Sequence, residues 1–163
     1  MALQERSALT CADPTTAVVA IQAYSPSWKG HLWDPLLEDI VGGNSVGSDF
    51  QIQGPLARVF PGPSNFTVPI YRLSNSALLD WAFLVSTNGA VPSASGYSVD
   101  GIVAYVYPTQ ICGSIPLYSV FSGSLGDHWY TTNINGRNRM IQLGYVDAGI
   151  QGYVLPLDCD CSS

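Results

Sequence analysis

The feature of this chain that most restricts its fold is an internal repeat with a period of about 47 residues. Residues 96–108 (GYSVDGIVAYVYP) and residues 144–156 (GYVDAGIQGYVLP) are identical at seven of thirteen positions, where about one identity is expected from ordinary residue frequencies. Upstream, residues 68–71 (VPIY) align with residues 115–118 (IPLY) at a separation of 47. Two units of one design therefore follow each other in register.

A third, more diverged unit precedes these two. Residues 50–61 (FQIQGPLARVFP) carry a glycine, a valine and a proline at the positions shared with residues 96–108. The front half of this unit lies in residues 21–34, where GHLW resembles the DHWY of residues 127–130. We therefore expect a single domain over residues 1–163, built from a first unit (18–64), a second unit (65–112) and a third unit (113–158).

Each unit is expected to contain four strands and little helix. β-favouring residues predict strands at 69–73, 81–85, 116–121 and 129–132. A glycine shared by the units is expected between two further strands, at a bulge or a tight turn. Residues 133–143 predict a short helix in the third unit, whereas the matching residues 87–95 and the extra residues Val41–Ser48 of the first unit are typical of loops.

The expected fold class is all-β with minor short helices. Three repeats of about 47 residues can close around an axis, and closure removes the exposed sheet edges that isolated units would have. The sequence therefore predicts pseudo-threefold symmetry in a β-trefoil-like arrangement of four-stranded units. An irregular threefold β assembly with small helices is the alternative.

The composition argues against several classes of partner. Only 11% of the residues are charged and the net charge is −6, so the chain lacks the basic surface that nucleic acids or anionic membranes require. No apolar run approaches the roughly 20 residues of a membrane span, so no membrane insertion is expected. Residues 1–10 lack the apolar stretch of a signal peptide, and we expect the mature form of a secreted, extracellular protein or one exported without a signal.

The cysteines predict a disulfide-bonded domain. With an even number of cysteines, two disulfides are expected, one of them joining Cys11 to Cys159 or Cys161. A zinc site would need C-x-x-C spacing and more ligands, so no metal or other cofactor is expected. Asn65 begins the sequon Asn-Phe-Thr, which predicts N-glycosylation. The four cysteines are Cys11, Cys112, Cys159 and Cys161.

The third unit carries a set of short motifs: PLY at 116–118, GDHWYTT at 126–132, LGY at 143–145, and GI followed by GYV within 149–154. These motifs resemble a family of repeats of unknown function in secreted fungal and bacterial proteins. Units of that family read roughly P-L-Y-R, G-D-H-F-Y-T-T, L-G-Y and E-G-I-A-G-Y-V-F. The second and third units together extend the resemblance over about 60% of the chain.

The units depart from this pattern in different ways. The second unit has DWAF at 80–83 where the family has D-H-F-Y, and the first unit lacks both the Asp and the Gly-Tyr pair. Members of the family are often secreted or attached to hydrolases. The resemblance therefore implies surface or carbohydrate binding, with no established chemistry to transfer to particular residues.

The densest group of candidate binding residues is Asp127, His128, Trp129 and Tyr130. A carboxylate and an imidazole can hydrogen-bond sugar hydroxyls, and aromatic faces can stack on the C–H side of a sugar ring. The structural alternative is that the Asp-His pair caps a turn while the aromatic residues fill the core. Alternation along a strand places Asp127 and Trp129 on one face and His128 and Tyr130 on the other, so one pair is expected in the core.

Equivalent positions in the other units extend the candidate site. They are His31, Trp33 and Asp34 in the first unit and Asp80 and Trp81 in the second. Three similar shallow sites would give multivalent binding. Arg137 and Arg139, which follow the third cluster, are either additional hydrogen-bond donors to a ligand or solvated surface arginines.

The leading functional hypothesis is a lectin-like protein that binds glycans or glycoproteins without catalysis. The alternative is a protease inhibitor of trefoil type that acts through the Val41–Ser48 loop. A small hydrolase is the least favoured, because the G-x-S-x-G match at 43–47, with Ser45, lies outside any βαβ pattern.

Overall fold

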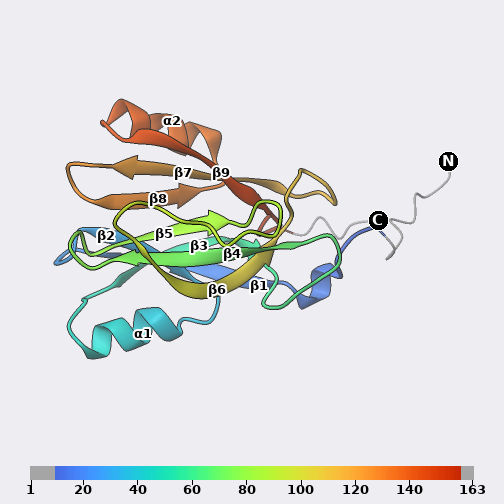
Figure 1. Cartoon of the computed structure of the whole chain (residues 1–163), viewed down its shortest axis with the longest axis horizontal. Coiled ribbons are helices and arrows are strands. Elements are labelled where there is room, and N and C mark those ends of the chain that lie inside the picture. The colour runs from blue at the N-terminus through green and yellow to red at the C-terminus, as the bar shows by residue number, and fades with distance from the viewer. Residues whose placement is uncertain (1–9, 159–163) are drawn as a thin grey trace.

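The computed structural model describes residues 10–158, which form three antiparallel sheets of three strands each (Figure 1). The sheets have the strand orders β2-β1-β3, β5-β4-β6 and β8-β7-β9, one sheet for each unit. The strands are β1 (Val18–Ser25), β2 (Gly30–Asp34), β3 (Gln51–Val59), β4 (Val68–Asn75), β5 (Asp80–Val85), β6 (Ser98–Val106), β7 (Ile115–Ser122), β8 (Asp127–Thr131) and β9 (Val146–Val154). The expectation of a mostly β chain is confirmed.

Each unit contributes three strands and not the four expected. The shared glycine does not separate two strands, because it lies inside the last strand of each unit at a β-bulge. Gly54, Gly101 and Gly149 have φ values of 140°, 152° and 90°, which a residue with a Cβ rarely adopts. The bulge bends the strand without interrupting its pairing. The bulge expected at the shared glycine is therefore present, but it lies within one strand and does not separate two strands.

The three sheets are joined in a closed order by short β-bridges between their last strands. Phe60 pairs with Tyr105, Tyr107 pairs with Tyr153, and Leu155 pairs with Arg58. The first unit thus meets the second, the second meets the third, and the third returns to the first. Phe60, Tyr107 and Leu155 also pack with Ala12 in a small apolar cluster.

The main core lies between the sheets and contains side chains from all three units. At equivalent positions of β2, β5 and β8 it holds Trp33, Phe83 and Tyr130, each no more than 1% exposed. Trp33 stacks on Phe83 at a centroid distance of 4.4 Å, and Phe83 meets the edge of Tyr130 at 5.4 Å. Phe83 of the second sheet therefore contacts both Trp33 of the first sheet and Tyr130 of the third.

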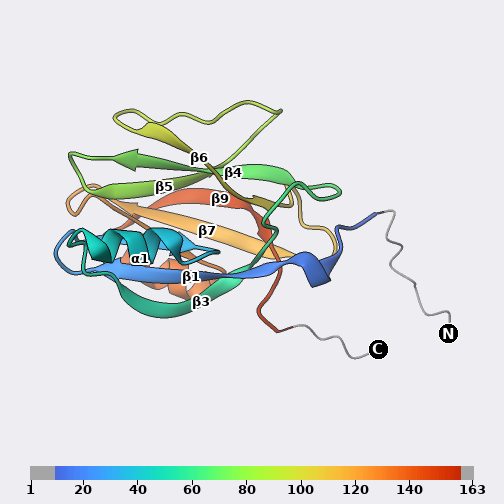
Figure 2. The same cartoon turned by 90° about the horizontal axis from the view of Figure 1, so that it is seen from below.

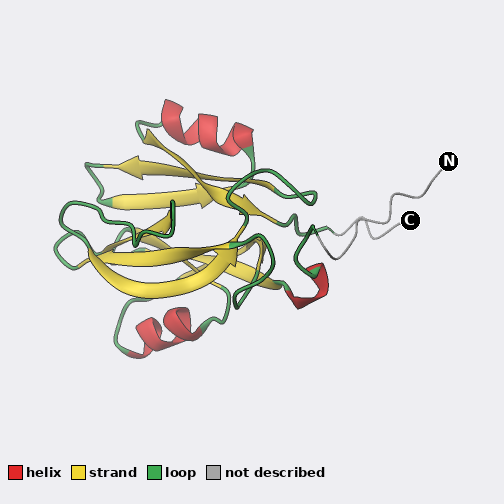
Figure 3. Ribbon diagram, turned by 45° about the vertical axis from the view of Figure 1, so that its right-hand side comes forward, coloured by secondary structure: helices red, strands yellow, loops and turns green. Residues whose placement is uncertain are grey.

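Two helices lie on opposite sides of the sheets, as the two views of Figures 1 and 3 show. Helix α2 (Ile134–Gln142) confirms the helix predicted in the third unit, and Thr87–Ser95 is a loop as expected. Helix α1 (Glu38–Ser45) corrects the loop predicted at Val41–Ser48. A short 3-10 helix, η1 (Pro14–Thr16), precedes β1. Helix α1 packs against β2, and Figure 2, which is seen from below, draws it over β1.

Close packing explains why a glycine-rich segment forms α1. A Cβ at Gly43 would lie 2.7 Å from the Ser48 hydroxyl and 3.1 Å from the Phe50 ring, so the helix approaches these residues more closely than another side chain would permit. The Asn44 amide accepts from the backbone N–H of Phe50 and donates to its carbonyl. Contacts with residues that follow the helix therefore stabilise it where composition favours a loop.

Cys11 forms a disulfide with Cys112, so the expected pairing of Cys11 with Cys159 or Cys161 is wrong. The reason is that Ala12 anchors the N-terminal segment in the small apolar cluster, where its N–H donates to the Tyr107 hydroxyl over 3.0 Å. This contact brings Cys11 beside Cys112, which lies in the loop between β6 and β7. Cys159 and Cys161 lie outside the described residues.

Within residues 10–158, no helix combines the length and the apolar character needed to cross a lipid bilayer.

Candidate functional site

A buried carboxylate connects the third unit to the first. Asp127 accepts hydrogen bonds from the backbone N–H of His31 (2.8 Å), from His31 Nδ1 (2.9 Å) and from the Tyr145 hydroxyl (2.7 Å). The Asp127 residue is 1% exposed. We call this arrangement of an Asp and a Tyr from one unit with a His from the next the polar clamp. It satisfies a charge that would be costly to bury alone.

The same polar clamp connects the second unit to the third. Asp80 accepts from the backbone N–H of His128 (3.0 Å), from His128 Nδ1 (2.6 Å) and from the Tyr97 hydroxyl (2.5 Å). The side chain of Asp80 is fully buried. Burial, followed by the hydrogen bond to Asp80, raises the pKa of Tyr97 above its usual range, so this hydroxyl keeps its proton and donates it to the carboxylate. The pKa of Tyr145 is raised by burial and by Asp127 in the same way.

The junction between the first and second units has no such clamp. Strand pairing places Gly30 at the position of Asp80 and Asp127, because these residues pair with Ser25, Asn75 and Ser122 at the same end of each hairpin. The clamp histidine is replaced by Trp81, and the clamp tyrosine is replaced by Phe50, whose ring lies 5.5 Å from Trp81.

Apolar residues therefore occupy all three clamp positions at this junction. A Cβ at Gly30 would lie 2.7 Å from the Leu79 carbonyl oxygen, so an Asp does not fit there. Trp28 stacks on Trp81 at 5.7 Å and meets Phe50 at 5.9 Å. The polar clamp of the other junctions is replaced by a cluster of three aromatic rings.

Two adjoining cavities open at this junction, each of about 210 Å³. The aromatic cavity is lined by Trp28, Phe50 and Trp81 from the cluster. The polar cavity is lined by the carboxyl-bearing residues Asp34, Glu38, Asp39 and Asp100 and by Trp33. Asp39 and Arg72 line both cavities. We therefore refer to the two cavities together as the paired cavities. The paired cavities bring aromatic faces next to charged hydrogen-bonding groups.

Helix α1 and the preceding strand fix one wall of the polar cavity. Asp34, at the end of β2, accepts from the backbone N–H groups of Leu36 and Asp39, both at 2.8 Å. Its carboxylate therefore holds the chain as it enters the first turn of α1. Asp39 in that turn forms an ion pair with Arg72 of β4.

The bulge in β6 fixes the opposite wall. Strand pairing passes from Arg72–Gly101 to Leu73–Val99, which leaves Asp100 as the extra residue of the bulge. Asp100 accepts from Arg72 Nε (3.0 Å) and from the Ser74 hydroxyl (2.7 Å). Bulges often redirect a side chain at a functional site. Arg72 is thus held between carboxylates of two different units, and its side chain is 20% exposed.

A buried hydrogen-bond donor without a protein partner adds to this site. Nε1 of Trp33 is buried and has no hydrogen-bond partner among the described residues. Trp33 also lines the polar cavity. Buried indole N–H groups are normally paired, and a missing partner is costly in the interior. An acceptor atom of a ligand would satisfy this donor.

The residues predicted from sequence lie in several different parts of the structure. Asp80, Asp127, His31 and His128 form the two polar clamps, and Tyr130 lies in the core with its hydroxyl accepting from the Phe83 N–H at 2.7 Å. Trp33, Asp34 and Trp81 line the paired cavities. The Gln22 amide, oriented to satisfy its neighbours, accepts from Trp129 Nε1 at 3.2 Å. Arg137 pairs with Asp147, and Arg139 contacts Gln142, both on the third unit.

Sequence reasoning missed Trp28, Asp39, Arg72 and Asp100, which complete the paired cavities. One signal was present in the sequence: the second unit has Trp81 in place of the motif histidine, and the first unit has Gly30 in place of the aspartate. Both departures meet at one junction. Their common location becomes visible only when the order of contact between units is known.

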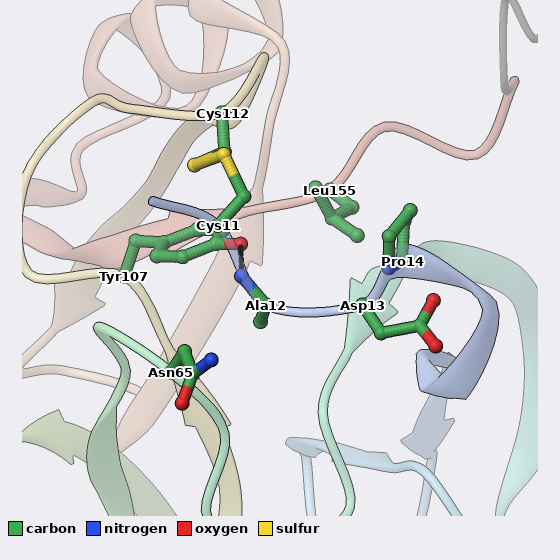
Figure 4. Close-up of a pocket in the computed structure, with 8 residues that line it drawn as sticks. All are labelled: Cys11, Ala12, Asp13, Pro14, Asn65, Tyr107, Cys112 and Leu155. Carbon is green, nitrogen blue, oxygen red and sulfur yellow. Dashed lines mark hydrogen bonds between the residues drawn. A yellow bond between two sulfur atoms is a disulfide. The ribbon is translucent and has the colours of Figure 1, made fainter. Parts of the chain in front are cut away.

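A larger cavity, of about 420 Å³, lies elsewhere, beside the disulfide (Figure 4). Two of its polar side chains are already engaged, since the Tyr107 hydroxyl accepts from the Ala12 N–H and Asp13 accepts from the N–H and hydroxyl of Thr15. Asn65 lies at this cavity and is exposed, which is compatible with the predicted glycosylation. Binding specificity needs convergent polar groups, and the paired cavities offer more of them.

The motif at 43–47 does not have the geometry of a nucleophile elbow. Ser45 is the last residue of α1, and its hydroxyl donates to the Gly42 carbonyl over 2.6 Å. The elbow requires a serine at a turn from a strand into a helix. Both histidines of the chain contact clamp carboxylates. In the part of the chain that the structure describes, no group of three or more His, Cys, Asp or Glu residues is arranged to hold a metal ion.

A family model described as a domain of unknown function (DUF5648) matches residues 19–155. No curated protein and no solved structure gives a significant match to the chain. The family match covers all three units, from the second residue of β1 to the residue after β9.

Proposed function

The chain belongs to this family of domains of unknown function (DUF5648), and we propose that it is a lectin-like carbohydrate-binding protein whose site is the paired cavities. The observation that carries the proposal is the loss of the polar clamp at one junction. Where Asp, His and Tyr connect the other units, this junction has Gly30, Trp81 and Phe50. The aromatic cavity lies at these replacements.

The chemistry of the paired cavities suits a sugar. The partly exposed rings of Trp28 and Trp81 offer apolar faces for the C–H side of a pyranose. Asp39, Arg72 and Asp100 offer acceptors and donors for hydroxyl groups within the same space. Their mutual ion pairs hold these side chains in place before a ligand binds, which reduces the entropy lost on binding.

We propose one principal site in each chain, where sequence equivalence suggested three. At the other two junctions the corresponding carboxylates and tyrosine hydroxyls are consumed by the polar clamps. Such buried groups cannot reach a ligand unless the units separate. Multivalent binding would then require several copies of the chain.

We also propose that the protein binds without catalysis and acts outside the cell. The hydroxyl of Ser45 donates to its own helix, which supports binding over hydrolysis. The Cys11–Cys112 disulfide is typical of an oxidising compartment. The helical conformation of residues 41–45 leaves less extended backbone for a protease inhibitor loop than the sequence suggested.

The closed order of contacts supports a pseudo-threefold arrangement of the units. The β-bridges run from each unit to the next and back to the first. The polar clamps connect the second unit to the third and the third to the first, and the central aromatic residues connect the first unit to the second and the second to the third. We propose that this arrangement descends from a symmetric ancestor resembling a β-trefoil. The first–second junction is the place where the symmetry is lost.

A glycan array tests the proposed function directly. We expect the protein to bind at least one class of oligosaccharide at micromolar to tens of micromolar concentration, a range typical of a single shallow site. Added free oligosaccharide should compete for that binding. If no glycan is retained at tens of micromolar protein, the carbohydrate-binding proposal fails.

A further inference from the structure

We infer that the ligand of the paired cavities is an amino sugar carrying a protonated amine, an inference that rests on the proposed carbohydrate-binding function. The first observation is the charge of the polar cavity. Four carboxyl-bearing residues line it, and Arg72 is the one cationic residue in its lining. Arg72 already contacts two of these carboxylates. The cavity is therefore acidic even after its ion pairs are counted.

The charges outside the cavities act in the same direction. Arg58 donates to the Pro156 carbonyl and Arg137 pairs with Asp147, so these cations are engaged away from the paired cavities. The net charge of the whole chain is −6. A cationic ligand would be attracted at long range, whereas an acidic or sulfated sugar would be repelled.

The aromatic cluster favours the same ligand class. Trp28, Phe50 and Trp81 line the cavity that adjoins the carboxylates. An ammonium group is attracted to the face of an indole ring, and the attraction is larger where water is partly excluded. A hexosamine places such an ammonium next to a pyranose ring that can stack. The two cavities together therefore match both parts of one sugar residue.

The unpartnered Trp33 Nε1 is the second, independent observation. This donor is buried in a residue that is 1% exposed and lines the polar cavity. An ammonium group cannot accept its hydrogen bond, but a sugar hydroxyl or ring oxygen can. Because Trp33 lines the polar cavity and its Nε1 has no partner among the described residues, a ligand with oxygen acceptors matches this wall better than one with positive charge alone. An amino sugar has both, whereas a lysine side chain supplies only the charge.

Titration calorimetry with two matched ligands tests this inference. The ligands are a β-1,4-linked glucosamine tetrasaccharide and its fully N-acetylated counterpart, compared at low salt and at a pH where the free amines are protonated. We expect the amino form to bind about tenfold or more tightly, and we expect this preference to shrink as added salt screens the charges. The exposed substitutions Glu38→Gln and Asp100→Asn should each reduce the preference several-fold. Asp147→Asn, which removes an exposed ion-paired carboxylate from the third unit, should leave it unchanged.

The possible failures are distinguishable. Equal or tighter binding of the acetylated form would overturn the amino-sugar inference and leave the proposed function standing. Binding of neither tetrasaccharide, together with a negative glycan array, would overturn the proposed function itself. Tetralysine binding as tightly as the amino sugar would overturn the inference in favour of a cationic peptide. A preference that survives both Glu38→Gln and Asp100→Asn would also contradict it.

Discussion

Replacing Asp127 by Ala should lower the free energy of unfolding by about 3 to 5 kcal/mol, because it removes a buried carboxylate that accepts several hydrogen bonds. The substitution leaves the N–H and Nδ1 of His31 and the Tyr145 hydroxyl without their acceptor in the interior. It also cuts the contact by which the third unit holds the first. At about 2 to 4 °C per kcal/mol for a chain of this size, Tm should fall by roughly 10 °C.

Urea unfolding followed by tryptophan fluorescence and circular dichroism measures this loss. Asp147→Ala is the control, because this carboxylate on the third unit pairs with Arg137 but its side chain is 46% exposed. An exposed pair of this kind contributes less than about 1 kcal/mol. If Asp127→Ala costs no more than the control, the polar clamp is not what connects these units. A double-mutant cycle with His31→Ala should show the coupling between the two residues directly.

Trp81→Ala should weaken oligosaccharide binding by about 30-fold or more, since an aromatic residue at the centre of a binding site typically contributes about 2 kcal/mol or more. Trp81 contacts both Trp28 and Phe50, so its removal takes away one of the three side chains that form the aromatic cluster. The Trp81→Phe variant should recover part of the affinity, because a smaller aromatic face remains for stacking.

Trp129→Ala is the control for this experiment. Trp129 lies on β8 in the third unit and contacts Gln22 and Gly136, away from the paired cavities. Binding should remain within about threefold of the wild type in that variant. Unfolding curves for both variants separate a loss of stability from a loss of affinity. Equal weakening by the two substitutions would contradict the placement of the site.

The repeat was sufficient to predict much of the fold. It matches the three three-stranded sheets. The mostly β character and the helix at Ile134–Gln142 follow from local sequence patterns. The helix α1 was not predictable, because it depends on close packing of Gly43 against Ser48 and Phe50, which follow the helix in the chain. The pairing of Cys11 depends on the anchoring of Ala12 at Tyr107, which is a contact between residues 95 positions apart.

The candidate site was predictable only in part. The sequence identified the Asp and His residues of the polar clamps as candidates and left open whether they bind a ligand or belong to the core, but it did not predict how they pair. The structure shows that each clamp histidine contacts the aspartate of the preceding unit, a long-range relation that strand alternation does not reveal. Asp100 and Arg72 were missed because a bulge in one strand brings them together.

The four tryptophans of the chain provide the most direct test of the central claim that sugar binds at the first–second junction. Each indole Nε1–H gives a separate signal in a ¹H–¹⁵N NMR spectrum, and single Trp→Phe variants assign the four signals. Titration with a bound oligosaccharide should shift the signals of Trp28, Trp33 and Trp81, which line the paired cavities. The signal of Trp129 should stay in place. A shift of Trp129 alone, with the other three unchanged, would contradict the account and return the site to the third unit.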